Sequence, residues 1–181
     1  MKDIAIYGAG GFGREVAWLI EEMNRLEGRF RVAGFFDDDA SLWGRNLNGH
    51  PVLGGVDALK GRKGTSVALA VGRPQSRMNV ARKLERMDLD FPNLIHPSVR
   101  LGPGVVFGRG NILCTDAIAT VNIRIGNFCH LNLKTSVGHD CVLEDFTTTA
   151  CGVDLAGNVH ALAGSYFGNH ATVLPGVTVG A

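Results

Sequence analysis

Two adjacent residues, His139 and Asp140, are the best candidates for catalysis in this sequence. A carboxylate beside an imidazole makes it a stronger base, and such a base accepts the proton of an attacking amine or hydroxyl group. Gly157 lies 18 residues further along the chain and offers a backbone N–H with no side chain in front of it. A bare N–H of this kind stabilises the oxyanion that forms during acyl transfer. Acyl transfer is therefore expected if the fold brings residues 139 and 157 together; otherwise His139 is an ordinary residue of a surface turn.

A second set of candidates is the glycine-rich segment Gly8-Ala-Gly-Gly-Phe-Gly13, which has the spacing G-x-G-x-x-G. It follows a short apolar run and precedes a helical pattern, so its backbone N–H groups are placed to meet a phosphate at a helix N-terminus. On its own the motif suggests NAD, with Asp37 or Asp38 on the ribose. The domain is too small for that reading, because about 90 residues supply only half the sheet that a dinucleotide spans. We expect the segment to hold the nucleotide of a nucleotide-linked sugar, and the alternative is a tight turn between strand and helix.

The other histidines and the cysteines do not form a metal-binding pattern. The four cysteines are separated by 15, 12 and 10 residues, which matches no zinc motif, and we expect buried thiols. A metal site on coils of 18 residues would need histidines 18 or 36 residues apart, and none in the second half of the chain has this spacing. We therefore expect no metal and interpret His130, His160 and His170 as surface or subunit-interface residues.

The elements around the glycine segment alternate between strand and helix. Short apolar runs at 4–7, 32–36 and 67–71 predict strands, and apolar residues at helical spacing predict helices over 13–26 and 73–87. A further apolar run at 91–95 is a candidate fourth strand. This order predicts a small parallel sheet in an α/β, Rossmann-like half domain over residues 1–94.

The second part of the chain, residues 95–181, is a strict hexapeptide repeat. Steps of six from Ile95 to Val179 meet fifteen residues, of which ten are Ile, Leu or Val, two are Phe and none is charged. The residues four positions later are also uncharged and are no larger than Ile. Each hexad is one short strand with a tight turn, and three hexads close a triangular coil of 18 residues. The repeat predicts an all-β, left-handed parallel β-helix in which residues 18 apart stack at about 4.8 Å. His139 then lies at a corner beneath Gly157.

Composition excludes several classes of protein. The chain has 181 residues with 45% hydrophobic residues, which is enough for a real core. Its formal net charge of +1 argues against a nucleic-acid-binding protein. The sequence contains no run of eighteen apolar residues that would predict a membrane span, and its start does not resemble a signal peptide. We expect a cytoplasmic protein.

Taken together, these motifs resemble the nucleotide-sugar N-acetyltransferases of the bacillosamine and perosamine type. These are grouped with the sialic acid O-acetyltransferases among the left-handed β-helix hexapeptide acyltransferases. The resemblance covers nearly the whole chain and rests on residues 7–15, 34–38, 47–54, 70–72, 137–140 and 156–158.

The resemblance implies transfer of acetyl from acetyl-CoA to the amino group of a nucleotide-linked amino-deoxysugar, by a homotrimer with its active sites in the grooves between β-helices. It implies that His139 is the general base, that Asp140 raises its basicity and that the Gly157 N–H meets the acetyl carbonyl. The residues that bind acetyl-CoA would be Gly157, Thr148 and Asn169. The residues that bind the nucleotide sugar would be Gly10, Gly11, Phe12, Asp37, Asp38, Gly72 and, near the general base, Asn132.

Two positions depart from the family pattern. Thr148 stands where some members carry a second histidine near acetyl-CoA, and Phe12 stands where some have a histidine in the glycine loop. Two other functions remain open: O-acetylation of a sialic-acid-like sugar, and a non-catalytic trimeric scaffold that binds nucleotide sugars. The sequence ends inside a predicted coil, so we expect either a truncated or a naturally short β-helix.

Overall fold

The computed structural model describes residues 1–180, which form two compact units. The first unit comprises residues 1–72 and 76–92. The second comprises residues 93–180 together with 73–75. Each unit has its own sheet architecture.

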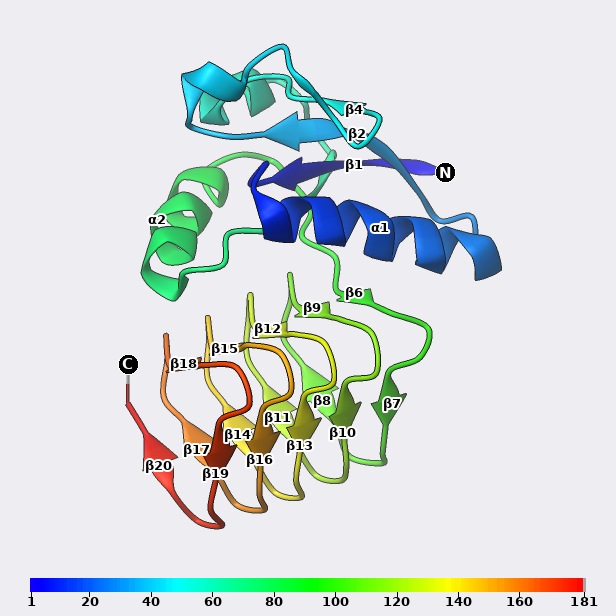
Figure 1. Cartoon of the computed structure of the whole chain (residues 1–181). Helices are drawn as coiled ribbons and strands as arrows, with labels where there is room; N and C mark the ends of the chain where they lie inside the picture. The colour runs from blue at the N-terminus through cyan, green and yellow to red at the C-terminus, as the bar shows by residue number, and fades with distance from the viewer. Residues whose placement is uncertain (181) are drawn as a thin grey trace. The chain divides into compact units, whose positions relative to one another are not determined.

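The first unit is built on a three-stranded parallel sheet in the order β2-β1-β5 (Figure 1). Its strands are β1 (Lys2–Tyr7), β2 (Phe30–Phe36) and β5 (Ser66–Leu69). Helix α1 (Gly11–Leu26) follows β1, and helix α2 (Pro74–Leu84) follows β5. The remaining elements are a hairpin of β3 (Asn46–Leu47) and β4 (His50–Pro51) and the 3₁₀ helices η1 (Ala40–Leu42) and η2 (Val56–Leu59).

Burial and close backbone contacts explain this local order. Ile4 and Ile6 of β1 are fully buried, as is Ile20 of α1, so the helix covers the sheet with its apolar stripe. The turn between them needs glycine at both ends. A Cβ on Gly13 would lie 1.8 Å from the carbonyl oxygen of Gly8, and Gly8 itself has a φ of +110°.

The expected fourth strand at 91–95 is wrong. Residues Leu94–Ile95 are β6, which pairs with Ile112–Leu113 in the second unit. Beside β5, the sheet of the first unit is extended by an isolated bridge between Ser66 and Asp90. The reason lies in Asn93, whose side chain donates to the carbonyl of Gly108 at 2.8 Å and accepts from the N–H of Asn111 at 2.8 Å. These bonds commit the segment to the first coil of the repeat.

The second unit is a parallel β-solenoid of about five turns, which confirms the predicted fold class (Figure 1). Fifteen strands of two residues are seen within residues 94–179 and stack as three sheets of five. The first face contains β6 (Leu94–Ile95), β9 (Ile112–Leu113), β12 (His130–Leu131), β15 (Thr148–Thr149) and β18 (Tyr166–Phe167). The second face contains β7 (Arg100–Leu101), β10 (Ile118–Ala119), β13 (Ser136–Val137), β16 (Asp154–Leu155) and β19 (Thr172–Val173). The third face contains β8 (Val106–Phe107), β11 (Arg124–Ile125), β14 (Val142–Leu143), β17 (His160–Ala161) and β20 (Thr178–Val179).

Both series of inward residues form the interior of the solenoid. Leu131, Val137 and Leu143 of the large series are at most 1% exposed, and Cys129 and Cys141 of the small series are fully buried. The cysteines of the described chain are free thiols. Corners of the coil use residues with positive φ, such as Asp140 at 60°, a conformation that Asn and Asp tolerate better than most side chains.

Candidate functional site

The structure brings His139, Asp140 and Gly157 together at one corner of the solenoid. His139 follows β13 and precedes β14, so it lies between the second and third faces. The register of β13 against β16 pairs Val137 with Leu155, which places residue 139 beside residue 157. A hydrogen bond of 2.8 Å from the Asn158 N–H to the His139 carbonyl fixes the two coils at this point.

The imidazole lies directly against the backbone of Gly157. A Cβ at Gly157 would be 2.4 Å from His139 Nε2 and 2.5 Å from Cε1, closer than real Cβ contacts allow. The absence of a side chain at 157 therefore makes room for the ring itself. This explains in steric terms why residue 157 is glycine.

The N–H of Gly157 has no hydrogen-bond partner within residues 1–180. The residue one coil later is Pro175, whose side chain carries no acceptor. At other corners the equivalent N–H donates to a side-chain oxygen of the next coil, as in Arg109 to Asn127 at 3.0 Å, Asn127 to Asp145 at 2.7 Å and Cys151 to Asn169 at 3.2 Å. The Gly157 N–H is thus a donor without a partner, located next to an imidazole.

Hydrogen bonds to Asp140 determine the orientation of the imidazole. His139 Nδ1 lies 2.7 Å from Asp140 Oδ2, and Asn122 Nδ2 donates to Asp140 Oδ1 at 3.3 Å. The hydrogen bond with His139, followed by that from Asn122, lowers the pKa of Asp140 below its ordinary value. An ionised carboxylate accepts the Nδ1 proton, which leaves Nε2, the atom facing Gly157, as the basic nitrogen.

Our sequence reasoning missed Asn122. The signal was available, because 122 and 140 differ by one coil of 18 residues. The structure places Asn122 on the carboxylate that orients His139.

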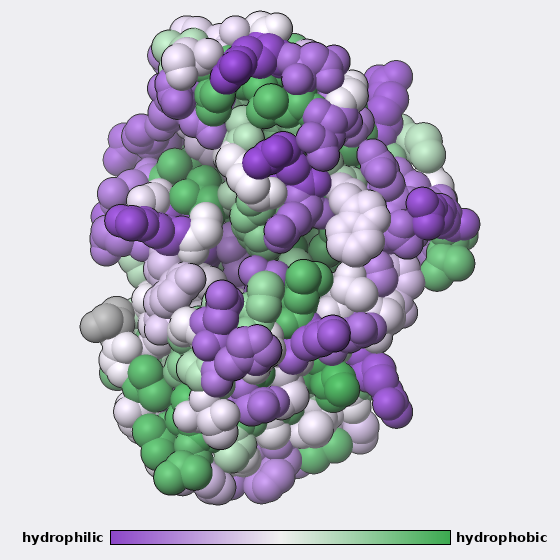
Figure 2. Space-filling view, viewed as in Figure 1, coloured by the Kyte–Doolittle hydropathy of each residue, from purple (hydrophilic) through white to green (hydrophobic). Residues whose placement is uncertain are grey.

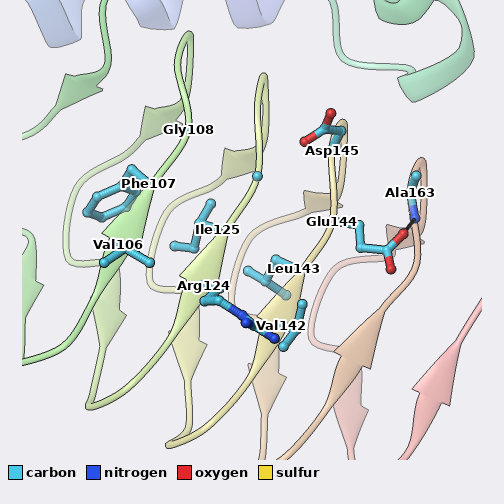
Figure 3. Close-up of a pocket in the computed structure, with 11 residues that line it drawn as sticks. Val106, Phe107, Gly108, Arg124, Ile125, Val142, Leu143, Glu144, Asp145 and Ala163 are labelled. Atoms are coloured by element: carbon cyan, nitrogen blue, oxygen red, sulfur yellow. Dashed lines mark hydrogen bonds between the residues drawn. The ribbon is translucent and has the colours of Figure 1, made fainter.

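An open groove of about 570 Å³ lies on the third face, along β8, β11 and β14 (Figure 3). This face begins at the corner that carries His139, since β14 starts three residues later at Val142. Glu144 borders the groove and is held by two hydrogen bonds, with Oε1 2.8 Å from His160 Nε2 and Oε2 accepting from the Ala163 N–H at 3.0 Å. The groove lining includes Val106, Phe107, Arg124, Ile125, Val142 and Leu143.

Three predicted residues of the solenoid lie away from His139 within one chain. Thr148 is buried in β15 on the first face. Asn132 and Asn169 lie at the corner between the first and second faces, where each caps a turn: Asn132 Oδ1 accepts from the Leu133 N–H at 2.8 Å, and Asn169 Oδ1 accepts from the Cys151 N–H. A single chain therefore does not bring these three side chains to the imidazole.

The predicted nucleotide residues of the first unit meet at the carboxyl edge of its sheet. Gly10 is the exposed N-cap of α1, and neither Gly10 nor Gly11 has an atom closer than 4.0 Å to an added Cβ. Phe12 follows in the first turn of the helix, whose N–H groups lack helical acceptors. Gly72 is exposed after β5, and its carbonyl accepts a hydrogen bond from Arg77 Nη1 at 3.1 Å.

The two aspartates at the end of β2 have different surroundings. Asp37 accepts hydrogen bonds from the N–H groups of Ala9 at 2.8 Å and Asp39 at 2.9 Å, so it shapes the glycine loop. Asp38 accepts a hydrogen bond from the Tyr7 hydroxyl and lies 3.4 Å from Lys83 Nζ. Partial burial acts to raise the pKa of Asp38, but the Tyr7 bond and the Lys83 charge outweigh it and the pKa is lowered. Burial of the Tyr7 hydroxyl, followed by its hydrogen bond to Asp38, raises the pKa of Tyr7.

The described residues contain neither a candidate metal centre nor a candidate membrane-spanning helix. Residues 1–180 contain no group of three or more His, Cys, Asp and Glu side chains arranged to hold a metal ion. In the same range, the helices lack the length and apolar character needed to cross a membrane.

Comparisons of the sequence and of the structure with known proteins find similar N-acetyltransferases. The family described as the PglD N-terminal domain matches residues 3–84. The chain is 30% identical over 180 residues to GDP-perosamine N-acetyltransferase of Escherichia coli O157:H7, which covers 98% of this chain and 80% of that protein.

Two solved structures share the fold over almost the whole chain. One is a mutant of perosamine N-acetyltransferase from Caulobacter crescentus in complex with CoA and GDP-perosamine, with a TM-score of 0.88 and 29% identity, covering 100% of this chain and 84% of that one. The other is the acetyltransferase domain of PglB from Neisseria gonorrhoeae FA1090 in complex with acetyl coenzyme A, with a TM-score of 0.85 and 26% identity, covering 99% and 85%.

Proposed function

Since the chain belongs to the family of GDP-perosamine N-acetyltransferase, we propose that it acetylates the amino group of a nucleotide-linked amino-deoxysugar, with His139 as the general base. The family resemblance drawn from the motifs is thereby confirmed. The protein is an acetyl-CoA-dependent sugar N-acetyltransferase, and acetyl-CoA is its co-substrate. The nucleotide-linked amino sugar and the residue roles are the proposed part.

One observation carries the proposal: a basic nitrogen and an unpartnered N–H lie side by side at the His139 corner. Nε2 of His139 is within 2.4 Å of the position that a Cβ on Gly157 would take, and the Gly157 N–H has no acceptor in the described chain. A base and an oxyanion donor at one point are what acyl transfer requires.

The chemistry that these groups support is aminolysis of a thioester. His139 Nε2 accepts a proton from the sugar amine as the amine nitrogen bonds to the acetyl carbon. The Gly157 N–H donates to the carbonyl oxygen while that oxygen carries negative charge. The C–S bond then breaks, the thiolate leaves, and His139 returns its proton to the sulfur. Asp140 keeps the imidazole in the tautomer with the proton on Nδ1.

In this proposal the first unit binds the nucleotide part of the substrate. Gly10 and Gly11 leave open space at the N-terminus of α1, where N–H groups and the helix dipole favour a phosphate. Asp38 and Gly72 lie at the same edge of the sheet and remain proposed substrate contacts. The proposed role of Asp37 is indirect, because its two oxygens already bind backbone N–H groups of this edge.

A homotrimer is part of the proposal. Asn132 and Asn169 lie at another corner of the solenoid than His139, so they reach a catalytic site only from a neighbouring copy. Thr148 is buried within its own chain and does not support this part of the proposal. The solenoid also carries exposed apolar side chains, and hydrophobic patches cover parts of it on the side seen in Figure 2. Such patches are typical of interaction surfaces. Because both proposed substrates are metabolites of the cytoplasm, we place the protein there.

The proposed function is tested by incubating the protein with acetyl-CoA and amino sugars linked to GDP, UDP or dTDP. Mass spectrometry should find one sugar nucleotide that gains an acetyl group, with stoichiometric release of CoA thiol. The new group should survive mild alkaline treatment, since an amide resists conditions that cleave an O-acetyl ester. Absence of product with every amino sugar, or an alkali-labile product, would contradict N-acetylation of a nucleotide-linked sugar.

A further inference from the structure

Trp43 is an exposed aromatic residue beside the proposed nucleotide site, and neither the motifs nor the proposed mechanism account for it. It directly follows η1 in the loop after β2 and is 50% exposed. Single exposed apolar residues are common on protein surfaces. What distinguishes Trp43 is that its indole is held in place.

Two contacts hold the indole. Nε1 donates to the carbonyl oxygen of Asp37 at 2.7 Å. On Gly55, which is buried, an added Cβ would lie 3.2 Å from Trp43 Cζ2 and 3.4 Å from Asp38 Oδ1. The ring therefore packs on a residue without a side chain, next to the carboxylate of Asp38. An aromatic ring that is already ordered loses little conformational entropy when it binds a ligand.

The same residues connect Trp43 to the glycine loop. Asp37 accepts from the Trp43 indole through its carbonyl oxygen and from the Ala9 N–H through its carboxylate. Asp38 accepts a hydrogen bond from the hydroxyl of Tyr7, the last residue of β1. The exposed indole is thus tied to the edge of the sheet where the glycine loop begins.

Charge decides which end of a nucleotide fits beside Trp43. Asp37 and Asp38 are carboxylates and would repel a diphosphate, whereas the N-terminus of α1 attracts one. Neutral groups that can donate hydrogen bonds, such as ribose hydroxyls and base N–H groups, suit the side of the carboxylates. A flat base with a π-face suits the indole.

We propose that the indole of Trp43 stacks on the nucleobase of the sugar nucleotide and sets the affinity of the first unit for it. This inference rests on the proposed function, because it assumes that the first unit binds a nucleotide. It adds the residue that contacts the base.

The test uses the two tryptophans of the chain. In a Trp18→Phe variant, Trp43 is the remaining tryptophan, so its fluorescence alone reports on the loop. Titration with GDP, and separately with UDP, should quench this fluorescence with the dissociation constant that calorimetry measures for the same nucleotide. Trp43→Leu should weaken binding about tenfold, and Trp43→Phe, which keeps a ring, should stay within about threefold of the parent protein.

Controls separate stacking from folding and from the proposed function. Thermal unfolding of both Trp43 variants should match the parent, and Trp18→Leu should bind nucleotide as the parent does. If a nucleotide binds by calorimetry but leaves the fluorescence unchanged, or binds Trp43→Leu equally well, the stacking role is wrong while the nucleotide site stands. If neither GDP nor UDP binds the parent protein, the nucleotide role of the first unit fails and this inference fails with it.

Discussion

At the scale of single residues, the contact between His139 and Gly157 leaves no room for a side chain at position 157. A Gly157→Ala substitution would put a Cβ 2.4 Å from His139 Nε2, so the imidazole must move away. We expect kcat to fall by roughly a hundredfold, as displacements of about 1 Å at a reacting group do. Steady-state kinetics of acetyl transfer measure this. Gly180→Ala is the matched control, because an added Cβ there meets no atom within 4 Å and activity should not change.

Asp140 gives a prediction about catalysis. Hydrogen bonds with His139 and from Asn122 lower the pKa of Asp140, so this group stays an ionised acceptor for the Nδ1 proton as the pH falls. In Asp140→Asn the amide can also donate to Nδ1, so the imidazole tautomer with its lone pair on Nε2 is no longer fixed. Steady-state kinetics should therefore find a lower kcat/KM at every pH at which the parent is active. A variant with the parental kcat/KM would contradict the proposed orienting role.

Much of this corner could be predicted from the sequence, because residues that are 18 positions apart stack on one another in adjacent coils. The arithmetic places residue 157 beside residue 139, and it could have placed Asn122 beside Asp140 in the same way. It could not show that the imidazole occupies the space over Gly157, which depends on a side-chain torsion. Nor could it show that the Thr148 side chain is buried within its own chain, because the period gives the stacking of the coils and not what covers an outward side chain.

At the scale of the elements, the narrow interior of the solenoid explains the strict repeat. Leu143 of β14 is 1% exposed and packs among residues of neighbouring coils. Leu143→Ala should lower the free energy of unfolding by about 2–5 kcal/mol, the usual cost of a cavity in a tightly packed core. Urea unfolding followed by circular dichroism measures the change. Leu174→Ala should cost far less, because Leu174 is 70% exposed, and equal losses would contradict the inward packing.

The elements differ in how far the sequence predicted them. The strands of the solenoid and its corners follow from the local period alone, since each strand pairs with the strands 18 residues before and after it, as β16 does with β13 and β19. The segment 91–95 was misassigned because an apolar run has the same appearance in either sheet, and the hydrogen bonds of Asn93 decide between them. The hairpin at 46–51 and the two 3₁₀ helices were missed, since elements of two to four residues that belong to no repeat carry almost no periodic signal.

At the scale of the whole molecule, the proposed active site draws residues from more than one copy of the chain. Native mass spectrometry should find a species of three times the monomer mass, because the solenoid exposes apolar side chains and the proposed acetyl-CoA residue Asn169 lies apart from His139. If each site draws residues from two copies, a mixture of His139→Ala and Asn169→Ala should be more active than the mean of the two variants measured separately. A fully active monomer would contradict the shared site.

We propose that His139 takes the proton of the sugar amine in acetyl transfer. The decisive measurement is the kcat of His139→Ala with the amino-sugar nucleotide that the protein acetylates, together with the dissociation constant for that nucleotide. We predict that kcat falls by about 10²–10⁴, the range for loss of a general base, while the dissociation constant stays within about twofold of the parent. A variant that turns over at the parental rate would contradict the account.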